Sequence, residues 1–156
     1  MLKKMGKRLK NERGLTLIEL LAVVVILGII AAIAIPSIGG LINNSKKDAH
    51  IANAQQMVSG ARLAVTSTEI PSGGKTYTLA DLISKGYLEE IDNPSEGEYN
   101  TTTSKVVVTK NANNSGYIYT VTLIGGGTNA TDGTASYFSP ADPDSLERDN
   151  VDLDGI

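Results

Sequence analysis

The chain has 156 residues, which is enough for one domain with an appended segment but not for two large hydrophobic cores. It contains no cysteine, which excludes disulfides, zinc–thiolate sites and thiol nucleophiles. Its single histidine has no recognisable nucleophile partner, so we expect no enzyme activity. The net charge of −3 divides into +5 on residues 1–14 and −8 on residues 15–156. The acidic part would be repelled by phosphate backbones, so we do not expect nucleic acid as the main ligand.

The basic residues stand directly before an apolar run. From Leu15 to Ile35 only Thr16 and Glu19 are polar, and as a helix this run would be roughly 31 Å long. The hydrocarbon core of a bilayer is about 30 Å thick, and cationic flanks stay on the cytoplasmic side. We therefore expect a single membrane-spanning helix over residues 15–35. The basic leader, residues 1–14, should lie inside the cell and the acidic remainder outside.

Three interpretations of residues 1–36 fit their charge and hydropathy. The first is a secretory signal peptide with a small-residue cleavage site at Ala32–Ala34, and the second is an uncleaved signal anchor. The third is a leader that is cut after Gly14. The first two have no use for Glu19, because a carboxylate in an apolar segment is unfavourable unless it has a partner.

A cut after Gly14 would supply that partner. It would free a positively charged α-amine on Leu15, next to the positive end of the helix dipole. In a staggered bundle of helices, Glu19 of one subunit would meet the Leu15 amine of its neighbour. A wrong stagger would leave both charges buried and unpaired, so we expect the pair to select the register of assembly.

Residues 36–70 are expected to form the amphipathic second half of the same long helix. Pro36 removes a backbone donor, and two glycines follow it, before an apolar face resumes at helical spacing. That face contains Leu41, Ile42, Ile51, Ala54, Met57, Val58, Ala61 and Val65. His50 follows the exposed pair Lys46 and Lys47, and we expect it to be an exposed helix residue. Proline and glycine near residue 71 end the helix.

Residues 71–156 are expected to form a small α+β head. Thr78 and Asp81 have capping-box spacing at the start of a short helix over residues 78–88, and Gly86 stands where a C-terminal cap glycine belongs. β-branched and aromatic residues predict an antiparallel hairpin of residues 104–110 and 117–124. A third strand at residues 135–138 would follow a flexible loop at residues 125–133. The acidic last residues should form a tail or a pinned loop.

The acidic tail also contains half of a calcium-binding pattern. Asn150, Asp152 and Asp154 place oxygens at the first, third and fifth positions of an EF-hand loop, followed by a glycine. The closing bidentate Glu is absent, so the alternative is a solvated acidic tail. Apart from this calcium hypothesis, we expect no cofactor.

The residues Arg13–Leu20, "RGLTLIEL", followed by an apolar run, resemble the N-terminus of type IV pilins, which is shared by the subunits of type IV pili and by secretion and competence pseudopilins. The resemblance covers about residues 8–40. Leu15 departs from the Phe that is usual at the first mature position, whereas Pro36 matches a proline that family members carry. The segment at residues 78–88 is similar to one in Gram-positive-type pilins, and the missing cysteine pair agrees with that type.

This resemblance implies the fold, the processing and the partners. The fold would be one long N-terminal helix packed on a small antiparallel sheet. A prepilin peptidase would cut after Gly14 and methylate Leu15, while Gly28 and Pro36 would bracket a stretch that loses helicity on assembly. Further partners would be other copies in a helical filament, minor pilins, membrane lipid before assembly, an inner-membrane assembly platform and a motor ATPase.

The resemblance leaves the role within the family open. The chain is expected to be a structural pilin, a single-pass membrane protein that becomes part of an extracellular filament. A minor pilin or a type II secretion or competence pseudopilin is the first alternative. An ordinary secreted or membrane-anchored binding module is the second alternative.

Overall fold

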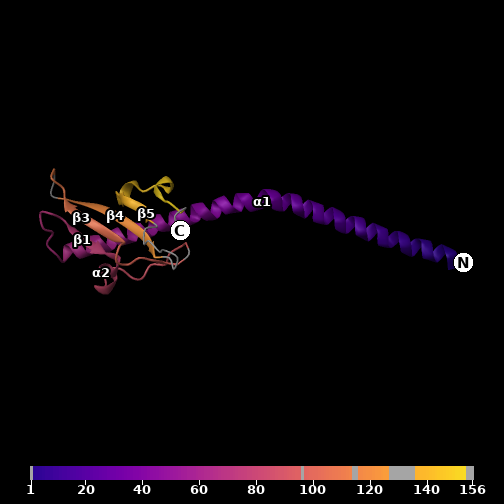
Figure 1. Ribbon diagram of the computed structural model, residues 1–156, viewed down its shortest axis with the longest axis horizontal. Coiled ribbons are helices and arrows are strands. Elements are labelled where there is room, and N and C mark those ends of the chain that lie inside the picture. Colours follow the sequence, from indigo (N-terminus) through magenta and orange to yellow (C-terminus); the bar gives the residue numbers. More distant parts are fainter. Residues whose placement is uncertain (1, 96, 114–115, 127–135, 154–156) are drawn as a thin grey trace. The chain divides into compact units, whose positions relative to one another are not determined.

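The computed structural model describes residues 2–95, 97–113, 116–126 and 136–153, and gives only the backbone of residues 2–15 and 139. The chain divides into two compact units, Met1–Ile42 and Asn43–Ile156. We call the second unit the head. Figure 1 shows one long helix followed in the chain by a small antiparallel sheet, and a short helix lies between the first two strands in sequence. This is the α+β architecture that the sequence predicted.

Helix α1 extends over Leu2–Thr66. The long helix is therefore confirmed, and it continues through Pro36, which lies inside it. Proline lacks an N–H, so the carbonyl of Ala32 loses its usual partner one turn back. In the first unit, Leu41 is 69% exposed and Ile42 is 50% exposed. Their predicted place on the packed face is wrong, because that face begins only in the head.

In the head, α1 buries one face. Ala54, Met57, Val58, Ala61 and Ala64 are all buried there, at the spacing of an amphipathic helix. They join one hydrophobic core with residues from the strands and from α2, among them Tyr77, Leu79, Leu82, Val106, Val108, Val121, Leu123, Tyr137 and Phe138. Met57 and its neighbours thus confirm the predicted face from residue 51 onward.

The sheet is built around β4. Its strands are β1 (Lys75–Thr78), β2 (Glu98–Tyr99), β3 (Lys105–Lys110), β4 (Tyr117–Gly126) and β5 (Ser136–Ala141), and every pairing is antiparallel. The order is β1-β3-β4-β2, and β5 also pairs with β4. The hairpin of β3 and β4 and the third strand are confirmed. The pairings of β1 with β3 and of β2 with β4 were not predicted. Strand β4 also includes Gly125 and Gly126, which were expected in the loop. Residues 127–135 lie outside the described residues.

Helix α2 (Leu79–Ser84) begins as its sequence predicts. The Thr78 hydroxyl accepts a hydrogen bond from the Asp81 amide at 3.0 Å, and the Asp81 carboxylate accepts one from the Thr78 amide at 3.3 Å. The hydrogen bonds within this capping box lower the pKa of Asp81. Gly86 has a φ of +72°, a left-handed conformation that glycine adopts without strain.

The acidic C-terminal residues fold as a pinned loop, as expected. They form two short 3₁₀ helices, η1 (Pro143–Ser145) and η2 (Arg148–Asn150). The Arg148 guanidinium donates two hydrogen bonds of 2.7 Å to the Asp48 carboxylate on α1. Val151 is buried, and the amide of Asp152 donates to the carbonyl of Tyr137 at 3.2 Å. These contacts hold the C-terminal segment on the head without a disulfide.

Candidate assembly segment

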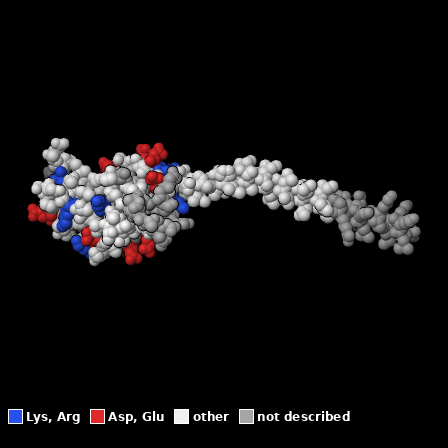
Figure 2. All heavy atoms as spheres, in the orientation of Figure 1, with Lys and Arg blue, Asp and Glu red and all other residues white. Residues whose placement is uncertain are grey.

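In the first unit, no described residue covers the large apolar side chains of α1. From Leu17 to Ile42 the large apolar side chains are between 50% and 71% exposed. Figure 2 shows this stretch as white, whereas the visible Lys, Arg, Asp and Glu side chains gather on the head. Among the described residues, α1 is the one helix long and apolar enough to cross a membrane. Exposed apolar area of this size is stable only in lipid or against other protein.

The predicted processing residues lie at the start of this stretch. Gly14 and Leu15 are in α1, where only their backbone is described, and Glu19 is an exposed residue one turn further along. Glu19 is the one carboxylate between residues 16 and 42. Its side chain takes part in no ion pair among the described residues. The cleavage, the methylation and the charge pairing all stay predictions.

Gly28 and Pro36 are also exposed positions of α1. A methyl group added at Gly28 would meet no atom within 4 Å. No described neighbour therefore requires a glycine at that position. Its predicted role with Pro36 in loosening the helix during assembly stays a prediction.

The calcium hypothesis depends on three residues, of which two are described. Asn150 and Asp152 are exposed near η2, and Asp154 lies outside the described residues. In the part of the chain that the structure describes, no three His, Cys, Asp or Glu residues are grouped so that they could hold a metal. The Asn150 side chain instead accepts a hydrogen bond from the Glu147 amide at 2.7 Å.

The expectation that His50 is exposed is wrong. Its side chain is fully buried between α1 and the sheet, stacked on the ring of Tyr137 with centroids 3.8 Å apart. Nδ1 lies 2.7 Å from the Tyr99 hydroxyl, and Nε2 lies 3.0 Å from the Ser95 hydroxyl. Burial and the nearby Lys46 ammonium lower the pKa of His50 to about 4. The helical spacing of residues 50, 54, 57 and 61 was the signal that could have placed it in the core.

Comparison with known proteins decides the family. Residues 9–35 match the prokaryotic N-terminal methylation motif. Over 80 residues the chain is 35% identical to Competence protein ComGC of Bacillus subtilis (strain 168), and this match covers 51% of the chain and 78% of that protein. The chain belongs to the type IV pilin-like family. A second relative in this family, ComG operon protein 3 homolog of Bacillus licheniformis, is 29% identical over 80 residues, with the same coverage of both chains.

Membership assigns this pilin-like chain to a class of structural pilins and pseudopilins that are not known as enzymes. The apolar N-terminal helix and the leader motif are the membrane-anchoring features of the chain. No solved structure matches it.

Proposed function

We propose that this chain is a subunit of a type IV pilus-like filament, cut after Gly14, methylated on Leu15 and assembled through residues 15–35. The observation that carries the proposal is the exposed apolar stretch of α1 with one carboxylate near its start. The basic leader would stay in the cytoplasm and the head would lie outside. Burial of the apolar helices against one another would drive assembly.

Glu19 would set the stagger between neighbouring helices. Moved from lipid into a bundle of helices, the carboxylate needs a positive partner, and the new α-amine of Leu15 on a neighbour supplies one. A pair of this kind adds little net stability, because both charges lose their hydration. Its effect is on specificity, since every other register would bury two unpaired charges.

The test is assembly by Glu19→Val and Glu19→Gln variants in cells that make the filament. Both variants should be inserted and cleaved as the parent is, but the yield of sheared filaments should fall at least tenfold. Thr16→Val is the matched control, because it removes the other polar residue of the segment without changing charge, and it should assemble normally. Normal filament yield from both Glu19 variants would refute the pairing.

A second candidate is the pseudopilus of a DNA-uptake apparatus. It is favoured by the 35% identity to a protein named as a competence protein. The two candidates share processing and assembly and differ in what depends on the filament. Deletion of the gene should abolish transformation by added DNA if the competence role holds, and should leave transformation unchanged if the filament serves another purpose.

Under either role the head itself would not be the main DNA-binding surface. The head carries a net charge of −7, which is the −8 of residues 15–156 without Glu19, and this opposes contact with phosphate backbones. The prepilin peptidase, an assembly platform with its motor ATPase and minor pilins would be the protein partners. Gly28 and Pro36 would be the places where the helix loosens in the filament, because both residues are poor helix formers.

A further inference from the structure

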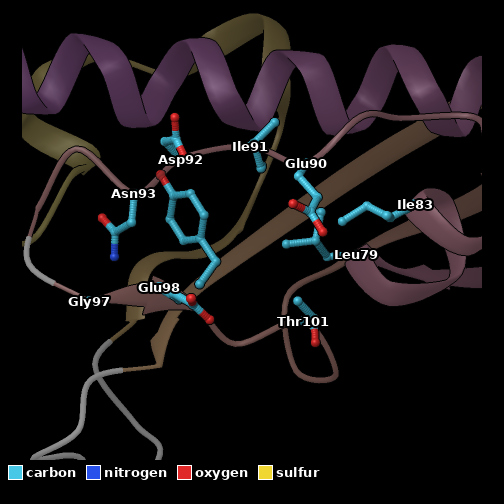
Figure 3. Close-up of a pocket in the computed structure, with 10 residues that line it drawn as sticks. Leu79, Ile83, Glu90, Ile91, Asp92, Asn93, Gly97, Glu98 and Thr101 are labelled. Atoms are coloured by element: carbon cyan, nitrogen blue, oxygen red, sulfur yellow. The ribbon is translucent and has the colours of Figure 1, made fainter.

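Residues 89–95 and 97, which we call the 89–97 segment, lie between α2 and β2 in the chain and have no regular secondary structure. None of its described residues takes part in a backbone–backbone hydrogen bond. Figure 3 shows it passing beneath α1, where it forms one wall of a pocket of about 400 Å³. Since secondary structure does not hold this segment, its side-chain contacts must.

The long-range hydrogen bonds made by the described residues of the 89–97 segment lead to one cluster. The Asn53 amide nitrogen donates to the carbonyl of Asp92 at 2.8 Å and to the Tyr99 hydroxyl at 2.9 Å. The Asn93 side chain bonds the Tyr137 hydroxyl at 3.0 Å, and Ser95 bonds His50. Tyr137 stacks on His50, so both of these contacts depend on the position of one imidazole.

The hydrogen-bond inventory fixes the protonation state of that imidazole. The Asp92 carbonyl can only accept, so the amide nitrogen of Asn53 faces it, and the other hydrogen of that nitrogen goes to the Tyr99 oxygen. The Tyr99 proton is then donated to Nδ1 of His50, which must be unprotonated, while Nε2–H donates to Ser95. The closed arrangement therefore requires neutral His50.

Protonation would reverse the bond to Tyr99. Nδ1 would become a donor facing a hydroxyl whose own proton has no other described acceptor, and a buried cation would be added beside Lys46. The other titratable groups at the ring are the hydroxyls of Tyr99 and Tyr137. No described carboxylate forms an ion pair with His50, and Asp48 nearby on α1 is bonded to Arg148.

We propose that the 89–97 segment is a proton-released latch, which detaches from α1 and β5 when His50 takes up a proton and which opens the pocket that it lines. Five of the pocket's ten lining residues belong to this segment, namely Glu90, Ile91, Asp92, Asn93 and Gly97. The hairpin of β3 and β4 has its own backbone ladder and stays closed. Opening is therefore confined to the 89–97 segment. It responds to mild acid outside the cell, where the proposed function places the head.

The experiment measures opening of the segment in the full-length chain in detergent micelles. A glutamate-specific protease cleaves after Glu90 when the segment is open. At each pH, the cleavage rate of the protein is divided by the cleavage rate of a free peptide of the same sequence. This ratio removes the pH dependence of the protease itself. Taking 6.5 as the pKa of a solvated His50 and about 4 as that in the closed state, this ratio should rise about tenfold at pH 5.5 and about 100-fold at pH 4. Cleavage after Glu69 and Glu147 should not rise with it.

Because His50 is the single histidine, its titration can be followed directly by NMR in the same samples. Lys46→Gln removes a charge that lowers the pKa of His50. It should therefore raise the midpoint of the histidine titration and lower the cleavage ratio reached at pH 4, because a smaller pKa difference between the open and closed states drives less opening. Lys47→Gln should change neither. His50→Gln should remove the pH dependence.

Two results would overturn the latch. One is a cleavage ratio that stays constant from pH 7 to pH 4, or one that Lys46→Gln leaves unchanged although it raises the midpoint of the His50 titration. The other is an equal rise of cleavage after Glu69 and Glu147, which would mean that the whole head unfolds.

Discussion

The imidazole of His50 is buried and uncharged in the folded head, and this links stability to pH. The unfolded chain takes up a proton on His50 below about pH 6.5, whereas the folded chain does so only near pH 4. Between these values the unfolded state binds more protons, so stability falls as the pH falls.

We therefore predict that the free energy of unfolding decreases by up to about 1.4 kcal/mol for each pH unit between pH 6.5 and pH 4. Urea unfolding of the full-length chain in micelles, followed by tyrosine fluorescence, measures it. His50→Gln should flatten the curve over this window. Below pH 4 a further loss is expected even in that variant, because the lowered pKa values of Asp48 and Asp81 then come into play. An equal slope in both proteins from pH 6.5 to pH 4 would contradict the assignment to His50.

Gly86 ends α2 in a conformation that other residues adopt only with strain. Its φ is +72°, and no atom lies within 4 Å of an added methyl group, so the cost of Gly86→Ala comes from the backbone alone. We expect it to destabilise the head by about 1 kcal/mol.

Gly73→Ala is the matched control for this change. Gly73 is equally open to an added methyl group but has no positive φ, so its replacement should cost almost nothing. Chemical unfolding of both variants decides the matter, and equal stabilities would show that the turn tolerates an alanine.

At the scale of elements, the C-terminal segment is held on α1 by charge. Asp48 and Arg148 form a two-bond pair, and Arg62 lies 3.8 Å from Asp144 further along the same helix. Arg148 lowers the pKa of Asp48, so this pair is present above the ordinary pKa of an aspartate and is lost as the pH falls below it.

We predict that Arg148→Ala speeds hydrogen exchange at the Asp152 amide, which bonds Tyr137, and leaves the amides of β3 unchanged. Asp48→Asn should have the same effect, and the double variant should be no faster than either single variant, because one interaction is lost in all three. Unaltered exchange at Asp152 in Arg148→Ala would show that burial of Val151 is sufficient to hold the segment.

The elements that the sequence predicted are those with long or chemically explicit signals. The apolar run, the helical face around Met57, the capping box of α2 and the hairpin of β3 and β4 each rest on several residues in a pattern. Strands β1 and β2 have only four and two residues. They form by hydrogen bonding to the free edges of β3 and β4, and no local sequence pattern encodes this pairing. The helical spacing of His50 with Met57 and its neighbours could have indicated its burial. Its partners Ser95, Tyr99 and Tyr137 could not be predicted, because they are more than 40 residues away.

At the scale of the whole molecule, the chain combines an apolar helix that its own residues do not cover with a head that has a complete core. The described part of the head buries most of its large apolar residues in one core, whereas those from Leu17 to Ile42 are at least half exposed and need lipid or other protein to cover them. This division is what a filament subunit requires, because the same helix can hold the monomer in the membrane and then join the core of an assembly.

The measurement that tests this account most directly is the intact mass of the chain purified from cells that contain its prepilin peptidase. We predict a mature chain that begins at Leu15 and carries one additional methyl group on its α-amine. A chain that begins at Ile35 would mean simple secretion after Ala34, and an uncut chain that begins at Met1 would mean a signal anchor. Either of these results would contradict the proposed function and the pairing of Glu19 with a neighbour's amine.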